Sequence, residues 1–227
     1  MRKLYLWLGC TALSGALLSH AWAGEIRGKI VISQRLTKPR VSIPNYQIRG
    51  PSTPLPAADA SIGGEFQGTA IYLETSAAVL PAPVAASLVQ KNQRFDPAMV
   101  ILPAGSTVSF PNADPIFHNV FSLSPAGEFD LGYYPAGETR EVVFDQPGVV
   151  QVYCHLHSDM SAAIVVVPTQ WYAKPDPTGA FAFANLPAGT YGVVVWHRAA
   201  GFFRRKVELS EQSSVELSFE IPLQEAP

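Results

Sequence analysis

Apolar and polar side chains alternate over short stretches of this chain, with the two-residue period that is typical of β-strands. Residues 25–33 and 68–75 are the first two stretches of this kind. The segment between them predicts an extended surface loop, because it holds Pro39, Pro44, Pro51, Pro54 and Pro56. Residues 76–86, which are rich in alanine and proline, are predicted to be a linker.

Turn signals become regular from residue 87 onward. The tripeptide Pro-Ala-Gly begins at Pro103, Pro125 and Pro135, and Pro147-Gly148 supplies a further turn. The strands expected in this region are 87–91, 97–102, 106–111, 117–122, 140–144, 149–153 and 162–167. About seven or eight strands in about eighty residues predict a β-sandwich over residues 87–168.

A second pattern of short strands follows, and we predict a small, separate β-sandwich over residues 169–227. Asp176 and Gly179 form a turn signal before the expected strands, which are 180–184, 191–196, 203–209 and 213–221. The predicted fold class is therefore all-β, with two sandwiches. The strands within residues 24–75 are predicted separately, and one alternative assigns them to this second sandwich.

The first 23 residues have the pattern of a cleaved secretory signal. Arg2 and Lys3 precede an apolar run from Leu4 to Leu18, and Ala21-Trp22-Ala23 places small residues at the two positions that a signal peptidase reads. A membrane anchor or a lipid on Cys10 is the alternative, but the run is shorter than the ~20 residues that a spanning helix needs. We expect an exported, periplasmic protein that begins at Gly24 and has no membrane span in the mature chain.

Composition changes this picture in two ways. The charged fraction is 15%, and removing two basic residues with the signal leaves 14 basic and 18 acidic residues, a net charge of −4. Such mild acidity gives no reason to expect nucleic acid as a partner. Signal cleavage also removes Cys10 and leaves Cys154 without a partner for a disulfide within the chain. It is then an inter-chain disulfide, a buried inert thiol or a metal ligand.

Cys154 stands among residues with the spacing of metal ligands. Cys154, His157 and Met160 follow one another at intervals of three, after an apolar strand whose alternation points the sulfur inward. His118 lies on an earlier strand between apolar residues, where an unpaired imidazole is costly to bury. One cysteine, two histidines and a weak axial methionine suit a blue-copper electron-transfer site. A zinc site with Asp159 is the alternative, and Met160 argues for copper.

The neighbours of these residues have predicted roles as well. Asn119, beside His118, is expected to tie the two ligand segments together by hydrogen bonding. His155 is expected to point away from the face of Cys154. Asp114 and Asp159 are expected to be turn or cap residues rather than ligands. Arg204-Arg205-Lys206 is expected to be a solvated basic run.

At these residues the chain resembles the cupredoxins. The pattern Cys-x-x-His-x-x-Met after an apolar strand, with His-Asn-Val upstream, has a loop length similar to that of amicyanin. The wider stretch from Gln90 to Val167 is similar to bacterial proteins of the methylamine-utilisation type. Residues 176–197, DPTGAFAFANLPAGTYGVVVWH, resemble a carboxypeptidase regulatory-like (transthyretin-like) sandwich. The resemblance implies a Greek-key sandwich with one copper ion, cycling between Cu(I) and Cu(II), on His118, Cys154, His157 and Met160.

These residues bear on three classes of function. The first is an electron carrier that meets transient redox partners, such as a dehydrogenase or a cytochrome, through a small apolar patch around His157. The alternative is a copper protein for storage, sensing or delivery, which predicts the same ligands but a labile metal. An enzyme is disfavoured, because a multicopper site needs further histidines and only four remain after signal cleavage.

Overall fold

The computed structural model describes residues 24–34, 36, 62–76 and 82–222. The predicted signal peptide and the proline-rich segment from Pro39 to Pro56 lie outside these residues. Within them the chain is almost entirely β-strand, with a single short helix, α1 (Ile62–Glu65), and a 3-10 turn over Phe66–Gly68. The prediction of an all-β fold is confirmed. No helix in the described part of the chain is both long enough and apolar enough to cross a membrane.

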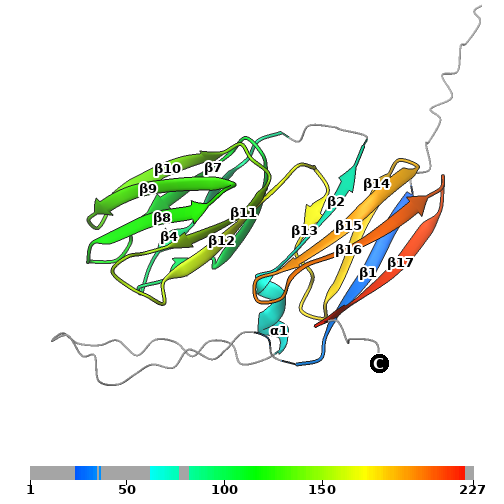
Figure 1. Ribbon diagram of the computed structural model, residues 1–227, viewed down its shortest axis with the longest axis horizontal. Helices are drawn as coiled ribbons and strands as arrows, with labels where there is room; N and C mark the ends of the chain where they lie inside the picture. Colours follow the sequence, from blue (N-terminus) through cyan, green and yellow to red (C-terminus); the bar gives the residue numbers. More distant parts are fainter. Residues whose placement is uncertain (1–23, 35, 37–61, 77–81, 223–227) are drawn as a thin grey trace, which may run out of the picture.

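The first sandwich is formed by the middle of the chain (Figure 1). Its larger sheet has the order β6-β12-β11-β8-β9, its smaller sheet has the order β10-β7-β3, and β4 and β5 form a two-stranded ribbon. The strands are β3 (Ala85–Ser87), β4 (Val89–Gln90), β5 (Phe95–Asp96), β6 (Met99–Pro103), β7 (Ser106–Pro111), β8 (His118–Ser124), β9 (Gly127–Tyr134), β10 (Thr139–Phe144), β11 (Gly148–Tyr153) and β12 (Ser161–Val167).

The inward faces of these two sheets bury one apolar core. On β7 the alternation is complete, with Val108 and Phe110 fully buried and their neighbours half exposed. Val150 and Val152 of β11 face them from the larger sheet and are also fully buried. Two of the Pro-Ala-Gly signals end in glycines with φ of +84° at Gly105 and +83° at Gly137, a backbone conformation that favours glycine in a tight turn.

The second sandwich combines the two ends of the described chain. β1 pairs in parallel with β17 and antiparallel with β14, while β2 pairs antiparallel with β15. One sheet has the order β14-β1-β17 and the other has the order β13-β2-β15-β16. The strands are β1 (Gly24–Ile32), β2 (Thr69–Thr75), β13 (Tyr172–Ala173), β14 (Ala180–Leu186), β15 (Gly189–His197), β16 (Gly201–Leu209) and β17 (Ser214–Ile221).

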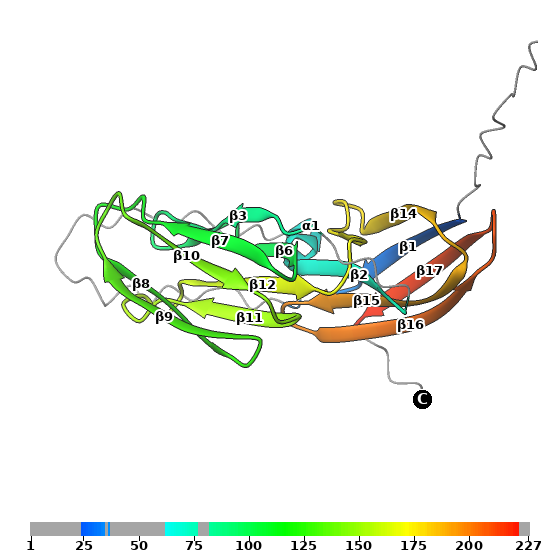
Figure 2. The same ribbon diagram turned by 90° about the horizontal axis from the view of Figure 1, so that it is seen from above.

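The two sandwiches lie end to end along the long axis of the molecule and share a buried apolar layer (Figure 2). This layer is formed by the outward faces of two strands of each sandwich, and its buried residues are Ala70, Tyr72, Met99, Ala163, Val165, Val167, Val194 and Trp196. β12 is therefore buried on both sides, because Ala162, Ile164 and Val166 on its other face belong to the core of the first sandwich. This explains why β12 reads as a continuous apolar run.

Two expectations about local structure are wrong. Ala85 and Ala86, expected in the linker, form the start of β3 and pair in parallel with β7. No strand was expected between Gly127 and Tyr134, yet β9 occupies that whole segment. β9 is an edge strand, and its side chains are mostly half exposed, so its apolar pattern is weak. The turn signals on both sides of the segment therefore favour a loop when the sequence alone is considered. The alternation of Glu128, Phe129, Asp130 and Leu131 is the signal that indicates a strand.

Candidate metal centre

Two adjacent strands of the larger sheet bring the candidate ligands together. β8 begins at His118, β11 ends one residue before Cys154, and Tyr153 of β11 pairs with Phe121 of β8. The alternation that buries Val150 and Val152 continues to Cys154, whose side chain is 5% exposed. His118 is fully buried at the start of its strand.

The loop from Cys154 to Met160 is closed by its own backbone. Cys154 N–H donates to the Met160 carbonyl at 3.2 Å, and Met160 N–H donates to the His157 carbonyl at 2.9 Å. These bonds turn His157 back toward the sulfur and bury Met160 completely in the same core cluster as Cys154. Asp159, expected to be a turn or cap residue, lies with Ser158 inside the turn that the second bond closes.

Three potential ligand atoms converge at the end of these strands. Cys154 Sγ lies 3.8 Å from His118 Nδ1 and 3.8 Å from His157 Nδ1. The two imidazole rings have centroids 4.9 Å apart, and all three ligand atoms lie within 4.8 Å of one another. Asp159, the fourth ligand of the zinc alternative, does not belong to this group and is exposed to solvent.

Asp114 orients His118. Its Oδ2 lies 2.7 Å from His118 Nε2, so the neutral ring carries its proton on Nε2 and turns its Nδ1 lone pair toward the sulfur, whereas the protonated ring can donate from Nδ1 to the Cys154 thiolate. The backbone N–H groups of Asn92 and Gln93 both donate to this carboxylate, and their φ angles of +54° and +56° are uncommon for residues other than glycine. A strained turn of another segment therefore holds Asp114 in place. The sequence pattern around Asp114 predicts only a turn residue and gives no signal of this role.

The environment of Cys154 favours the thiolate. Burial opposes ionisation, but hydrogen bonds from His118, the backbone N–H of Asn119 and His157 outweigh it and lower the pKa of the thiol from 9.0 to about 6. Burial likewise lowers the pKa of His118, but its contacts with Cys154 and Asp114 prevail and raise it. The thiolate is the form in which cysteine binds a metal ion.

Titration of the metal-free protein should therefore show thiolate at unusually low pH. The ultraviolet thiolate absorbance, measured against Cys154→Ala, should develop around pH 6 rather than 9. The unfolded chain keeps this thiol protonated up to its ordinary pKa of 9.0. The contribution of the thiolate to the free energy of unfolding is therefore present above pH 9 and is lost as the pH falls through 6. An absorbance that develops only near pH 9 would show that the histidines do not stabilise the thiolate.

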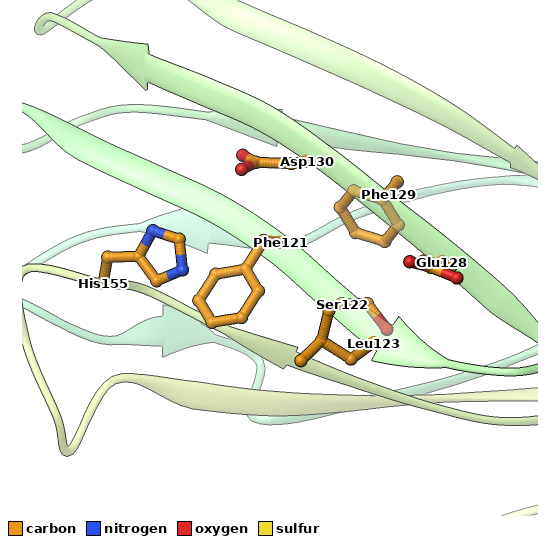
Figure 3. A pocket seen from close by; sticks show the side chains of 7 residues that line it. All are labelled: Phe121, Ser122, Leu123, Glu128, Phe129, Asp130 and His155. Atoms are coloured by element: carbon orange, nitrogen blue, oxygen red, sulfur yellow. The ribbon is translucent and has the colours of Figure 1, made fainter.

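Asn119 and His155 lie beside the centre in different ways. The side-chain Nδ2 of Asn119 donates to Asp130 Oδ1 of β9 at 2.7 Å, so the link between the two ligand segments comes from its backbone N–H instead. His155 does not belong to the converging group. Its ring stacks on Phe121 with centroids 3.9 Å apart (Figure 3). It lines a pocket of about 290 Å³ together with Phe121, Ser122, Leu123, Glu128, Phe129 and Asp130.

Comparison with known proteins gives partial similarities to copper proteins. No family model and no curated protein matches the sequence. A purple cupredoxin from Nitrosopumilus maritimus is 28% identical over 33% of this chain and 83% of its own, with a TM-score of 0.31. A reduced amicyanin variant is 19% identical over 43% of this chain and 98% of its own, with a TM-score of 0.35.

A copper-containing nitrite reductase from Thermus scotoductus is 26% identical over 38% of this chain, with a TM-score of 0.34. The chain spans only 23% of the length of that reductase. These solved structures are similar to less than half of the chain. The resemblances to methylamine-utilisation proteins and to the carboxypeptidase regulatory-like sandwich stay predictions.

Proposed function

We propose that this protein is an exported, mononuclear copper protein of the blue type that carries single electrons between redox proteins. His118, Cys154 and His157 would be the three strong ligands, and Met160 a weak axial ligand. The copper ion would supply the one-electron change between Cu(I) and Cu(II). The protein itself would turn over no substrate.

The observation that carries this proposal is the pair of equal distances from Cys154 Sγ to the two Nδ1 atoms, 3.8 Å each. For the bonds of about 2.3 Å to sulfur and 2.0–2.1 Å to nitrogen that these ligands make with zinc, tetrahedral to trigonal angles place the sulfur and a nitrogen about 3.6–3.8 Å apart. Each imidazole nitrogen therefore lies at a distance from the sulfur that one metal ion can bridge. A thiolate with two imidazoles and a buried thioether nearby is the donor set that suits copper in electron transfer.

The frame around the ligands favours an electron carrier over a storage or delivery protein. His118 is fully buried and fixed by Asp114, and Cys154 and Met160 are tied to each other through the backbone. A rigid donor set limits the change in geometry on reduction, which keeps the barrier to electron transfer low. A delivery site needs ligands that can move to release the ion, and these buried, hydrogen-bonded residues do not favour release.

His157 is the ligand that we assign to electron exchange with partners, because it is half-buried whereas His118, Cys154 and Met160 are buried. Phe117 and Leu156 are adjacent in sequence to the two histidine ligands and are 56% and 52% exposed. Exposed apolar side chains of this size suit a small, transient interface with a dehydrogenase or a cytochrome.

The histidine count supports a protein with one copper ion rather than several. The sequence has five histidines, one of which, His20, lies in the predicted signal peptide. His197 is paired with buried Glu65, with Nε2 and Oε2 3.3 Å apart, and His155 is stacked on Phe121. These two are engaged away from the ligand group, so the chain is short of histidines for a second copper site of the histidine-rich kind.

Voltammetry of the protein loaded with one equivalent of copper tests the carrier proposal against storage and delivery. We expect one reversible one-electron wave, and repeated cycles with a Cu(I) chelator present should leave the bound copper unchanged. Storage or delivery would be the better account if reduction released the copper to the chelator or if the wave were irreversible.

A further inference from the structure

The ligand loop is held from outside by the second sandwich, through one side chain. Arg198 follows β15 directly, and its Nη2 donates to Ser161 Oγ at 2.7 Å, with the Ser161 carbonyl at 3.4 Å. Ser161 is the first residue of β12 and is bonded to Met160. The guanidinium therefore reaches the junction between β12 and the loop that carries Cys154, His157 and Met160.

Both residues of this contact are fixed in their own sheets. Ser161 pairs with Tyr153, the residue before Cys154, in the β11–β12 ladder. Arg198 N–H donates to the Gly68 carbonyl at 2.9 Å, at the end of the β2–β15 pairing. The contact thus joins two segments whose backbones are each held by hydrogen bonds within a sheet or at its end.

The contact also continues the buried layer between the sandwiches. Ser161 alternates with Ala163 and Val165 on the outward face of β12, and Arg198 follows β15, whose Val194 and Trp196 belong to the same layer. The layer is therefore apolar along most of its length and ends in a charged hydrogen bond at the ligand loop. Charge-assisted bonds of an arginine fork are directional, so this end of the layer specifies position as well as contact.

From this geometry we propose that Arg198 is a positioning residue for the ligand loop, so that the second sandwich sets the place of Met160 relative to Cys154. The inference rests on the proposed function, since the axial role of Met160 is part of it. Without the hydrogen bond from Arg198 to Ser161, the junction between the loop and β12 becomes more mobile, and the Met160 thioether is less firmly positioned. Arg198 itself does not touch the ligand atoms.

Amide hydrogen exchange in the copper-free protein tests this inference without the metal. Arg198→Met removes the donors but keeps an unbranched chain, and exchange at Cys154 and Met160, both hydrogen-bonded within the loop, should accelerate by about 2- to 10-fold, the equivalent of one net hydrogen bond. Arg205→Met, at an exposed position of β16, is the matched control and should leave that exchange unchanged.

The copper-loaded protein provides a second readout. Arg198→Met should shift the reduction potential, Arg205→Met should not, and Arg198→Lys should restore part of the wild-type value. Ser161→Ala should shift the potential in the same direction as Arg198→Met, and the effect of the double variant should be smaller than the sum of the two, because both remove the bond between Arg198 Nη2 and Ser161 Oγ. Ser161→Ala also keeps the test informative if Arg198→Met fails to fold.

The possible outcomes separate the two proposals. Unchanged loop exchange and unchanged potential in both single variants would overturn the role of Arg198 while leaving the copper proposal intact. A wild-type protein without a copper–thiolate spectrum would overturn the proposed function. In that case, accelerated exchange in both single variants would still support the inference that Arg198 and Ser161 restrain the loop.

Discussion

Replacing Asp114 with asparagine is expected to weaken copper binding by about 10- to 100-fold, the usual cost of losing the group that orients a histidine ligand. The carboxylate accepts from His118 Nε2 at 2.7 Å and from two backbone N–H groups, of Asn92 and Gln93. An amide has the same shape but no charge, and its NH2 group would face donors. His118 would then lose both the fixed direction of Nδ1 and part of its basicity.

The affinity of Asp114→Asn is best measured by competition with a chelator of known copper affinity, against Asp159→Asn as the control. Asp159 lies in the ligand loop and is exposed, so this control makes the same change of charge without touching His118. The control should bind copper within about twofold of the wild type, because exposed charges interact weakly through water. Equal affinities of the two variants would show that Asp114 has no part in holding the ligand.

The candidate ligands in the loop are predictable from the sequence because their spacing is local. Cys154 and His157 lie in one short loop after an apolar strand, and His118 lies on a strand between apolar residues. The structure brings these three together, and it buries Met160 in the same core. Asp114 is four residues from His118, yet its orienting role depends on donors at positions 92 and 93, which no local pattern connects to it.

The fold is predictable to a similar extent. Regular turn signals locate most strands of the first sandwich, since glycine and proline restrict the backbone wherever they occur. The edge strand β9 is missed because an edge strand buries few side chains and its alternation is weak. The pairing of β1 with β17 joins residues about 190 positions apart. At that separation the sequence shows only that each strand has an apolar face to bury, and it does not show which strand is the partner.

The buried layer between the sandwiches connects the second sandwich to β12, the strand that follows the loop of the candidate metal centre. Lys174 Nζ donates to the Met99 carbonyl at 2.7 Å, and Arg198 bonds to Ser161, so two basic residues of the second sandwich are bonded to strands of the first. Burial lowers the pKa of Lys174, which agrees with its place at this layer. With one face of β12 packed against the second sandwich, we expect this strand to move less than it would in the first sandwich alone.

Visible absorption and electron paramagnetic resonance spectra of the mature protein, loaded with one equivalent of copper(II), test whether the Cys154 thiolate binds copper. The two variants to compare are Cys154→Ser and His155→Gln. The serine variant keeps the size of the side chain but removes the thiolate, which the copper–sulfur charge-transfer band requires. The glutamine variant changes a neighbouring imidazole that stacks on Phe121 and lies outside the ligand group.

We expect an intense visible band and a narrow copper hyperfine splitting in the wild type. Both features should persist in His155→Gln and disappear completely in Cys154→Ser. A colourless wild-type protein, or a weak copper spectrum that is the same in Cys154→Ser, would contradict a thiolate–copper centre and with it the proposed electron carrier.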